Sequence, residues 1–184
     1  MGDSHISTSP IDNLRFMKAL SISGKLLANY VHDINSHVPP VDFVLHLGDI
    51  TDMGLTWEFA RARRILDSLD CPVYSVLGNH DNFGSSRKQF WKKFEGRDST
   101  SYTLDYGGFH FIFIDCTPDP CDPAKVGCDG TLRAWVAQDL AINHSKPTFV
   151  ISHYNMWTRG WNAEFDTTGS YVEHTGMPEL RRVL

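Results

Sequence analysis

The apolar residues of the chain form short continuous runs and one clear stripe of helical period. The runs are VDFVLHLG (41–48), VYSVLG (73–78) and PTFVIS (147–152), which predict buried strands. Five apolar residues between the first two runs lie on one face of a predicted helix: Leu55, Phe59, Ala62, Leu66 and Leu69. A strand, a helix and a strand in this order predict a parallel, right-handed βαβ unit.

A second pattern predicts a hairpin. The segments YTLDY (102–106) and FHFIFID (109–115) flank Gly107-Gly108, a pair typical of a two-residue hairpin turn. An antiparallel pair therefore joins the parallel strands, and the fold class is α/β with mixed β-sheets.

The N-terminal part of the chain predicts a long helix. Ser9 suits a helix cap and Pro10 suits the first helical position. Apolar residues from Phe16 to Ile34 then recur at roughly helical spacing. We expect one helix over about residues 10–34.

Composition narrows the class of protein. With 184 residues, of which 41% are hydrophobic, the chain has material for one domain with a substantial core. The formal charge of −5 offers no general basic field for duplex nucleic acid or an anionic membrane. No apolar run approaches the ~20 residues of a membrane span. No signal peptide is visible, so we expect a cytoplasmic protein.

Four cysteines at irregular spacing form no zinc-ribbon pattern. We interpret them as reduced thiols. Three of them, Cys116, Cys121 and Cys128, share one long loop. A disulfide in this loop is the alternative if the protein is exported.

Polar side chains follow the predicted parallel strands where each strand ends. Asp49 comes after Gly48, Asn79 and His80 come after the second run, and His153 comes after the third. Because the carboxyl ends of parallel strands meet at one edge of a sheet, we expect these side chains to gather there. The N-terminal Asp3-Ser4-His5 adds donors that face one side if the tripeptide is extended.

Five of these residues are candidate metal ligands: Asp3, His5, Asp49, Asn79 and His153. Oxygen and nitrogen donors without a thiolate favour Mn, Fe or Zn. The two oxygens of Asp49 suit a bridge between two divalent ions. Two ions ~3.5–4 Å apart hold a phosphate for in-line attack by a hydroxide bound between them. As catalytic residues we expect His80, as a donor to the leaving oxygen, and Asp52, which would orient it.

Four blocks in this order resemble the calcineurin-like metallophosphoesterases: Asp3-Ser4-His5, Gly48-Asp49-Ile50-Thr51-Asp52, Gly78-Asn79-His80-Asp81 and His153. The resemblance implies a four-layer α/β/β/α sandwich with a dinuclear site. It also implies that Asp3 and His5 hold one metal, that Asn79 and His153 hold the other, and that Asp49 bridges them. The run GDITDMG is most similar to the bacterial branch that contains cyclic-nucleotide phosphodiesterases.

The family's final Gly-His-x-His block is absent from the 184 residues. We therefore expect residues 1–184 to form a single but partial metallophosphoesterase domain. The predicted function is metal-dependent hydrolysis of a small or nucleotide-like phosphate ester, in particular a phosphodiester.

Other interpretations stay open. The chain is also consistent with an inactive remnant, or with a binding module that uses Trp157 and Trp161 as a contact surface. Asp49 and Asp52 also suit a simple helix start, and His153 suits a structural role. Metal identity, monoester or diester preference and oligomeric state remain open.

Overall fold

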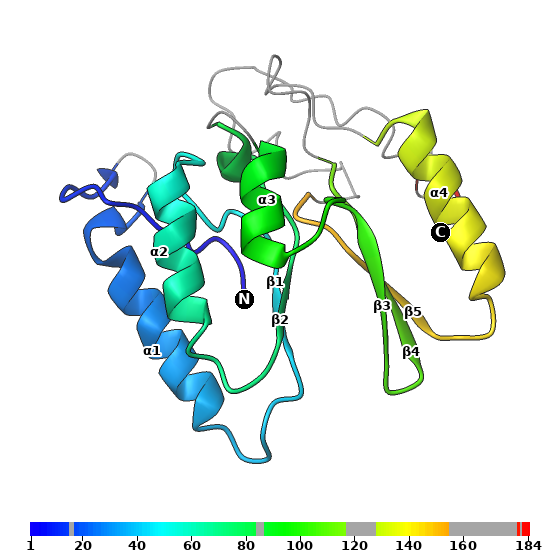
Figure 1. The fold of residues 1–184 in the computed structure, drawn as a ribbon, viewed down its shortest axis with the longest axis horizontal. Coiled ribbons are helices and arrows are strands. Elements are labelled where there is room, and N and C mark those ends of the chain that lie inside the picture. The colour runs from blue at the N-terminus through cyan, green and yellow to red at the C-terminus, as the bar shows by residue number, and fades with distance from the viewer. Residues whose placement is uncertain (15–16, 84–86, 117–127, 155–179, 181) are drawn as a thin grey trace. The chain divides into compact units, whose positions relative to one another are not determined.

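The computed structural model describes residues 1–14, 17–83, 87–116, 128–154, 180 and 182–184. They fold into two compact units, residues 1–100 and residues 101–184. In unit 1 the helices α1 and α2 lie side by side, and unit 2 combines a sheet with the helix α4 (Figure 1). The single domain expected over residues 1–184 stays a prediction.

Unit 1 contains the predicted βαβ arrangement. Strands β1 (Val44–His46) and β2 (Val73–Ser75) pair in parallel, and helix α2 (Thr56–Leu66) connects them. The buried residues of α2 include three of the predicted stripe: Phe59, Ala62 and Leu66. Helix α3 (Arg87–Glu95) contributes Trp91 and Phe94 to the same core.

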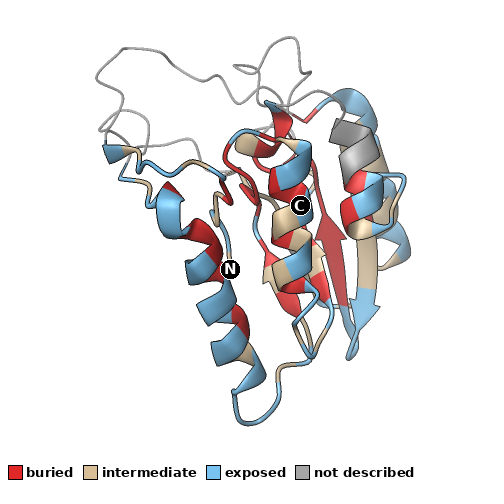
Figure 2. Cartoon of the chain, turned by 60° about the vertical axis from the view of Figure 1, so that its left-hand side comes forward, coloured by how far each residue is buried: buried red, intermediate tan, exposed pale blue. Residues whose placement is uncertain are grey.

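The N-terminal helix begins later than predicted. After the short 3-10 helix η2 (Leu20–Ile22), α1 runs over Ser23–Asn35, with buried residues along one side (Figure 2). Asn13 and Lys18 exchange two backbone hydrogen bonds, and the Asp12 carboxylate accepts from the backbone N–H of Ser21 at 2.9 Å. These contacts use polar groups that a helix from residue 10 would need for itself, so the early start was wrong.

Unit 2 contains the predicted hairpin and a parallel neighbour. Strands β3 (Tyr102–Tyr106) and β4 (Phe109–Phe113) are antiparallel, and β5 (Thr148–Ile151) pairs in parallel with β4. Gly107 and Gly108 have φ of +59° and +86°, the left-handed conformation that a tight hairpin turn requires. The predicted mixed sheet is confirmed.

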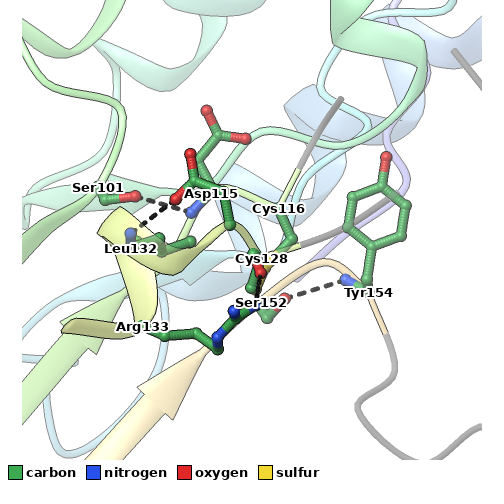
Figure 3. The surroundings of a disulfide bond; sticks show 9 residues. Ser101, Asp115, Cys116, Cys128, Leu132, Arg133, Ser152 and Tyr154 are labelled. Atoms are coloured by element: carbon green, nitrogen blue, oxygen red, sulfur yellow. Dashed lines mark hydrogen bonds between the residues drawn. A yellow bond between two sulfur atoms is a disulfide. The ribbon is translucent and has the colours of Figure 1, made fainter. Parts of the chain in front are cut away.

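The core of unit 2 joins this sheet to α4 (Gly130–Ile142) through apolar side chains that include Ile112, Ile114, Val136 and Leu180. Two cysteines belong to the same core, and they form a disulfide, Cys116–Cys128 (Figure 3). The prediction of reduced thiols is therefore wrong for this pair. Cys116 and Cys128 are 12 positions apart, and this spacing alone does not predict a disulfide. Only the folded chain brings their two Cα atoms to 5.2 Å.

Helix α4 begins beside the disulfide. Asp129 caps the helix, since its carboxylate accepts from the backbone N–H of Leu132 at 2.7 Å. Arg133 donates to the carbonyl of Cys128 (Figure 3). None of the helices that the structure describes is long and apolar enough to cross a membrane.

Candidate metal centre

Two loops at the ends of β1 and β2 form the base of the site. Gly48 (φ +93°) turns the chain out of β1, and Asp49 follows. Gly78 follows β2, and a Cβ atom there would overlap the Asp49 carboxylate. The loops therefore touch at a point where only glycine fits. The predicted meeting of the strand ends is confirmed for these two strands.

Asp81 ties the two loops together. Its buried carboxylate accepts from the backbone N–H groups of Ile50 (3.2 Å), Thr51 (2.8 Å) and Gly78 (2.9 Å), and from the Thr51 hydroxyl. Burial raises the pKa of Asp81 to about 6, against the effect of these hydrogen bonds. Asp81 was not among the predicted site residues, although its position in Gly78-Asn79-His80-Asp81 was the available signal.

The N-terminal segment runs beside the loop that follows β1. Backbone N–H groups of Asp3, His5 and Ile6 donate to the carbonyls of residues 48, 49 and 50 at 2.9–3.0 Å. These bonds hold Asp3 and His5 next to Asp49. The tripeptide does not meet the condition of an extended backbone, because Asp3 and His5 both have positive φ.

Left-handed backbone is concentrated at the candidate ligands. Asp3, His5 and Asp49 have φ of +54°, +40° and +48°, and among the described non-glycine residues only Met17 shares this feature. Such a conformation costs about 1–3 kcal/mol and persists only where the surroundings enforce it. Strained backbone of this kind is found mostly at functional sites.

The donor atoms are close enough to share an ion. His5 Nε2 lies 3.5 Å from Asp49 Oδ2 and 3.9 Å from Asp3 Oδ1. Ligand atoms of His5, Asp49 and His80 all lie within 4.8 Å of one another. Carboxylate oxygens with imidazole nitrogens fit Mn, Fe and Zn, so the residues present suit the expected ions.

His80 is oriented mainly by backbone groups. The backbone N–H of His80 donates to Asp49 Oδ1 at 2.9 Å, and the ring Nδ1 of His80 lies 2.6 Å from the backbone carbonyl oxygen of Asp52. Since a carbonyl only accepts, Nδ1 carries a proton. The predicted partner, the Asp52 carboxylate, lies farther away, with Oδ1 at 3.7 Å from Nδ1.

Lys18 is the residue of this site that sequence reasoning missed. Its Nζ lies 3.1 Å from Asp52 Oδ1, 3.2 Å from His5 Nδ1 and 3.1 Å from His80 Nε2. The side chain is 17% exposed. No local signal marks it, because the partners are 13 to 62 positions away in the sequence.

The remaining predicted ligands, Asn79 and His153, belong to different units. In unit 1, Asn79 is half-buried and directly precedes the short 3-10 helix η3 (His80–Asn82). In unit 2, His153 is half-buried, follows β5 by two residues and packs edge-on against Tyr154. Trp157, Trp161 and Cys121 lie outside the described residues.

Comparison with known proteins gives a family match over nearly the whole chain. The model of the calcineurin-like phosphoesterases matches residues 1–181. A probable glycerophosphodiester phosphodiesterase of Arcobacter nitrofigilis is 32% identical over 93 residues, 50% of this chain and 34% of that protein. A 3′,5′-cyclic adenosine monophosphate phosphodiesterase of Pseudomonas aeruginosa is 27% identical over 89 residues, 48% of this chain and 31% of that protein. The matches thus span about one third of each relative.

A solved structure has the same fold. The crystal structure of a dimetal phosphatase from Danio rerio superposes with a TM-score of 0.67 at 16% sequence identity. The superposition covers 85% of this chain and 69% of that protein. It confirms the predicted α/β fold class of the metallo-dependent phosphatases.

Proposed function

Because the chain belongs to the calcineurin-like phosphoesterase family, we propose that it provides the metal centre of a phosphate-ester hydrolase. The observation that carries the proposal is that donor atoms of two proposed ligands, His5 and Asp49, lie within 4.8 Å of each other and of the proposed proton donor, His80, on three separate segments of unit 1. The proposed ligands are the five residues Asp3, His5, Asp49, Asn79 and His153. When bound, two divalent ions supply an activated water and offset charge on the phosphoryl oxygens.

The chain's own residues hold the donors in place before any ligand binds. Asp81 joins the loops that carry Asp49 and Asn79, and backbone hydrogen bonds hold Asp3 and His5 beside them. Such preorganisation lowers the cost of assembling a charged site. Asp49 would hold both ions, because its carboxylate group has two oxygens.

His80 is the proposed proton donor to the leaving oxygen. Its Nδ1–H is fixed on the Asp52 carbonyl, so Nε2 is the nitrogen that can exchange a proton. In the imidazolium form Nε2–H is a hydrogen-bond donor suited to a departing alkoxide. Asp52 supports this role through its carbonyl group and through its carboxylate near the ring.

The proposed substrates are small phosphodiesters. The two curated relatives are named for a glycerophosphodiester and for cyclic adenosine monophosphate, and both are small molecules with one diester phosphate. Mn, Fe and Zn all suit the mixed donor set, so the proposal covers divalent ions of this group.

We also propose a compartment, and the support comes from the cysteines. A cytoplasmic location was our expectation, but disulfides persist in oxidising compartments. The Cys116–Cys128 disulfide therefore favours an oxidising compartment for the mature protein. Counting free thiols in the protein isolated from its source, with alkylation and mass spectrometry, tests this directly. Reduced Cys116 and Cys128 would restore the cytoplasmic expectation.

The test of the function is hydrolysis of bis(p-nitrophenyl) phosphate by the 184-residue chain, with and without added Mn²⁺. Asn79→Ala is the test variant, and Asn29→Ala, an exposed asparagine on α1, is the matched control. We expect Mn²⁺-dependent turnover that Asn79→Ala lowers at least about 100-fold, as ligand loss exceeds the 10- to 100-fold cost of outer-shell changes. Asn29→Ala should keep full activity.

Two results would separate the alternatives. Mn²⁺ binding without turnover by a folded chain would favour the inactive remnant. Neither Mn²⁺ binding nor turnover, with Asn79→Ala behaving as the unchanged chain, would favour a binding module.

A further inference from the structure

The ammonium group of Lys18 lies among the polar side chains of the site. Its Nζ is within 3.2 Å of Asp52 Oδ1, His5 Nδ1 and His80 Nε2. These atoms come from three segments of unit 1, and an ammonium has three N–H donors. The side chain keeps 17% of its surface exposed.

A short loop delivers this side chain to the site. Asn13 and Lys18 exchange two backbone hydrogen bonds of 2.9 and 3.0 Å, which close the loop. Met17, the preceding residue, has φ of +53° and is 92% exposed, whereas Leu20 two residues later is buried. The backbone of Lys18 is therefore held by Asn13, and its side chain lies at the donor cluster.

The contacts of Lys18 are more than an ion pair requires. The Asp52 carboxylate alone would balance the charge of Lys18. The other two contacts are to ring nitrogens of His5 and His80, and a neutral imidazole nitrogen is a weaker acceptor for an ammonium group than an anionic oxygen. An anion that enters the site can therefore replace these two contacts while the Asp52 pair remains.

We propose that Lys18 binds an unesterified oxygen of the phosphate group of the substrate, beside His80. This inference rests on the proposed function, because it assumes that a phosphate ester occupies the site. It adds a residue that recognises the anionic phosphoryl group itself, independently of the rest of the substrate. An ammonium serves here as a compact point charge, which suits a phosphoryl oxygen in any orientation.

The experiment measures anion binding, so it does not depend on turnover. Inorganic phosphate is titrated calorimetrically into the 184-residue chain, with and without Mn²⁺, and Mn²⁺ binding is measured separately by electron paramagnetic resonance. The variants are Lys18→Met and Lys18→Arg. Lys25→Met is the matched control, because Lys25 is an exposed lysine on α1. Circular dichroism checks that each variant folds.

We expect Lys18→Met to bind phosphate about 10- to 100-fold more weakly, the effect of one charge-assisted hydrogen bond. Its Mn²⁺ affinity should stay within about threefold of the unchanged chain, since Lys18 is not a metal ligand. Lys18→Arg keeps the positive charge on a side chain of different shape. Its phosphate affinity should lie between those of Lys18→Met and the unchanged chain. Lys25→Met should bind both ions normally.

Three results would overturn the inference about Lys18. They are normal phosphate affinity in Lys18→Met, equal losses of Mn²⁺ and phosphate affinity in that variant, and a chain that binds Mn²⁺ but no phosphate. A chain that does not bind Mn²⁺ would instead contradict the proposed function. The titrations without metal would then decide on Lys18 alone, because a phosphate site lost in Lys18→Met would still support its role.

Discussion

Each unit of the molecule contains a group of histidine, aspartate and lysine side chains, and the two groups differ in how tightly their members are bonded. In unit 2, His110 Nδ1 lies 2.6 Å from Asp105 and Nε2 lies 2.5 Å from Asp139, while Lys146 lies 2.6 Å from Asp105. In unit 1, the contacts of the His5 ring with carboxylates measure 3.4–3.9 Å.

The two groups also differ in backbone conformation, which is regular at His110 and left-handed at His5 and Asp49. His110 lies within the regular strand β4, opposite Asp105 on β3. His5 and Asp49 have left-handed backbone at φ of +40° and +48°. Short bonds on regular strand backbone are typical of a cluster that stabilises its fold, whereas strained backbone is found mostly at functional sites. Residue types alone would not have separated the two.

The charge state of His110 follows from its surroundings. Burial would lower the pKa of this histidine, but hydrogen bonds with the Asp105 and Asp139 carboxylates outweigh burial and raise it. Both ring nitrogens therefore carry protons over a wider range of pH than in a free histidine. The group binds β3, β4 and α4 together.

The largest effect is expected from Asp49→Asn. Mn²⁺ affinity should fall at least about 100-fold, because the variant removes a charged ligand. The free energy of unfolding should stay level or rise, since asparagine tolerates positive φ and the Asp49 charge acts against the ionised Asp81. Mn²⁺ titration and urea unfolding of the same sample measure both. A large loss of stability would mean that the unit 1 group is structural as well.

A smaller effect is expected from Asp139→Asn, and it concerns stability instead of Mn²⁺ affinity. Loss of a charged partner of His110 should lower the free energy of unfolding by about 1–3 kcal/mol near pH 6, with no effect on Mn²⁺ affinity. Urea unfolding followed by tryptophan fluorescence measures it.

The pH dependence of unfolding gives a second test of the Asp139→Asn variant. Because the folded pKa of His110 is raised above its usual 6.5, the folded chain holds a proton that the unfolded chain releases above that pH. The stabilisation is thus complete below about pH 6.5 and is lost as pH rises through the folded value. Unfolding at pH 6 and pH 9 should show a weaker pH dependence for Asp139→Asn. If the free energy of unfolding changed equally with pH in Asp139→Asn and in the unchanged chain, the pH dependence would belong to a group other than His110.

The smallest effect on stability is expected from Asp3→Gly. Asp3 has φ of +54° and a side chain that is 67% exposed, so glycine relieves strain without leaving a cavity. The free energy of unfolding should rise by up to about 1 kcal/mol, while Mn²⁺ affinity falls. Asp33→Gly, an exposed position inside α1, is the matched control and should lose stability. Destabilisation by Asp3→Gly would contradict the assignment of strain.

Local patterns in the sequence were enough for most of the elements and for the meeting of the loops that follow β1 and β2. The hairpin at Gly107-Gly108, the stripe of α2 and the polar residues after β1 and β2 follow from short-range periodicity and turn chemistry. Asp49, Asn79 and His80 could be identified because each directly follows a buried run. Their roles in metal binding and catalysis stay predictions.

Only the tertiary structure decided which distant side chains meet. Lys18 lies 34 positions from Asp52 and 62 from His80, His110 lies 29 from Asp139, and Cys116 pairs with Cys128 across a loop. The late start of α1 follows from the same cause, because the Asn13–Lys18 bridge replaced the helix that local propensity favoured. Periodicity reports which face of an element is buried, whereas the partner of a polar side chain depends on the packing of the whole unit.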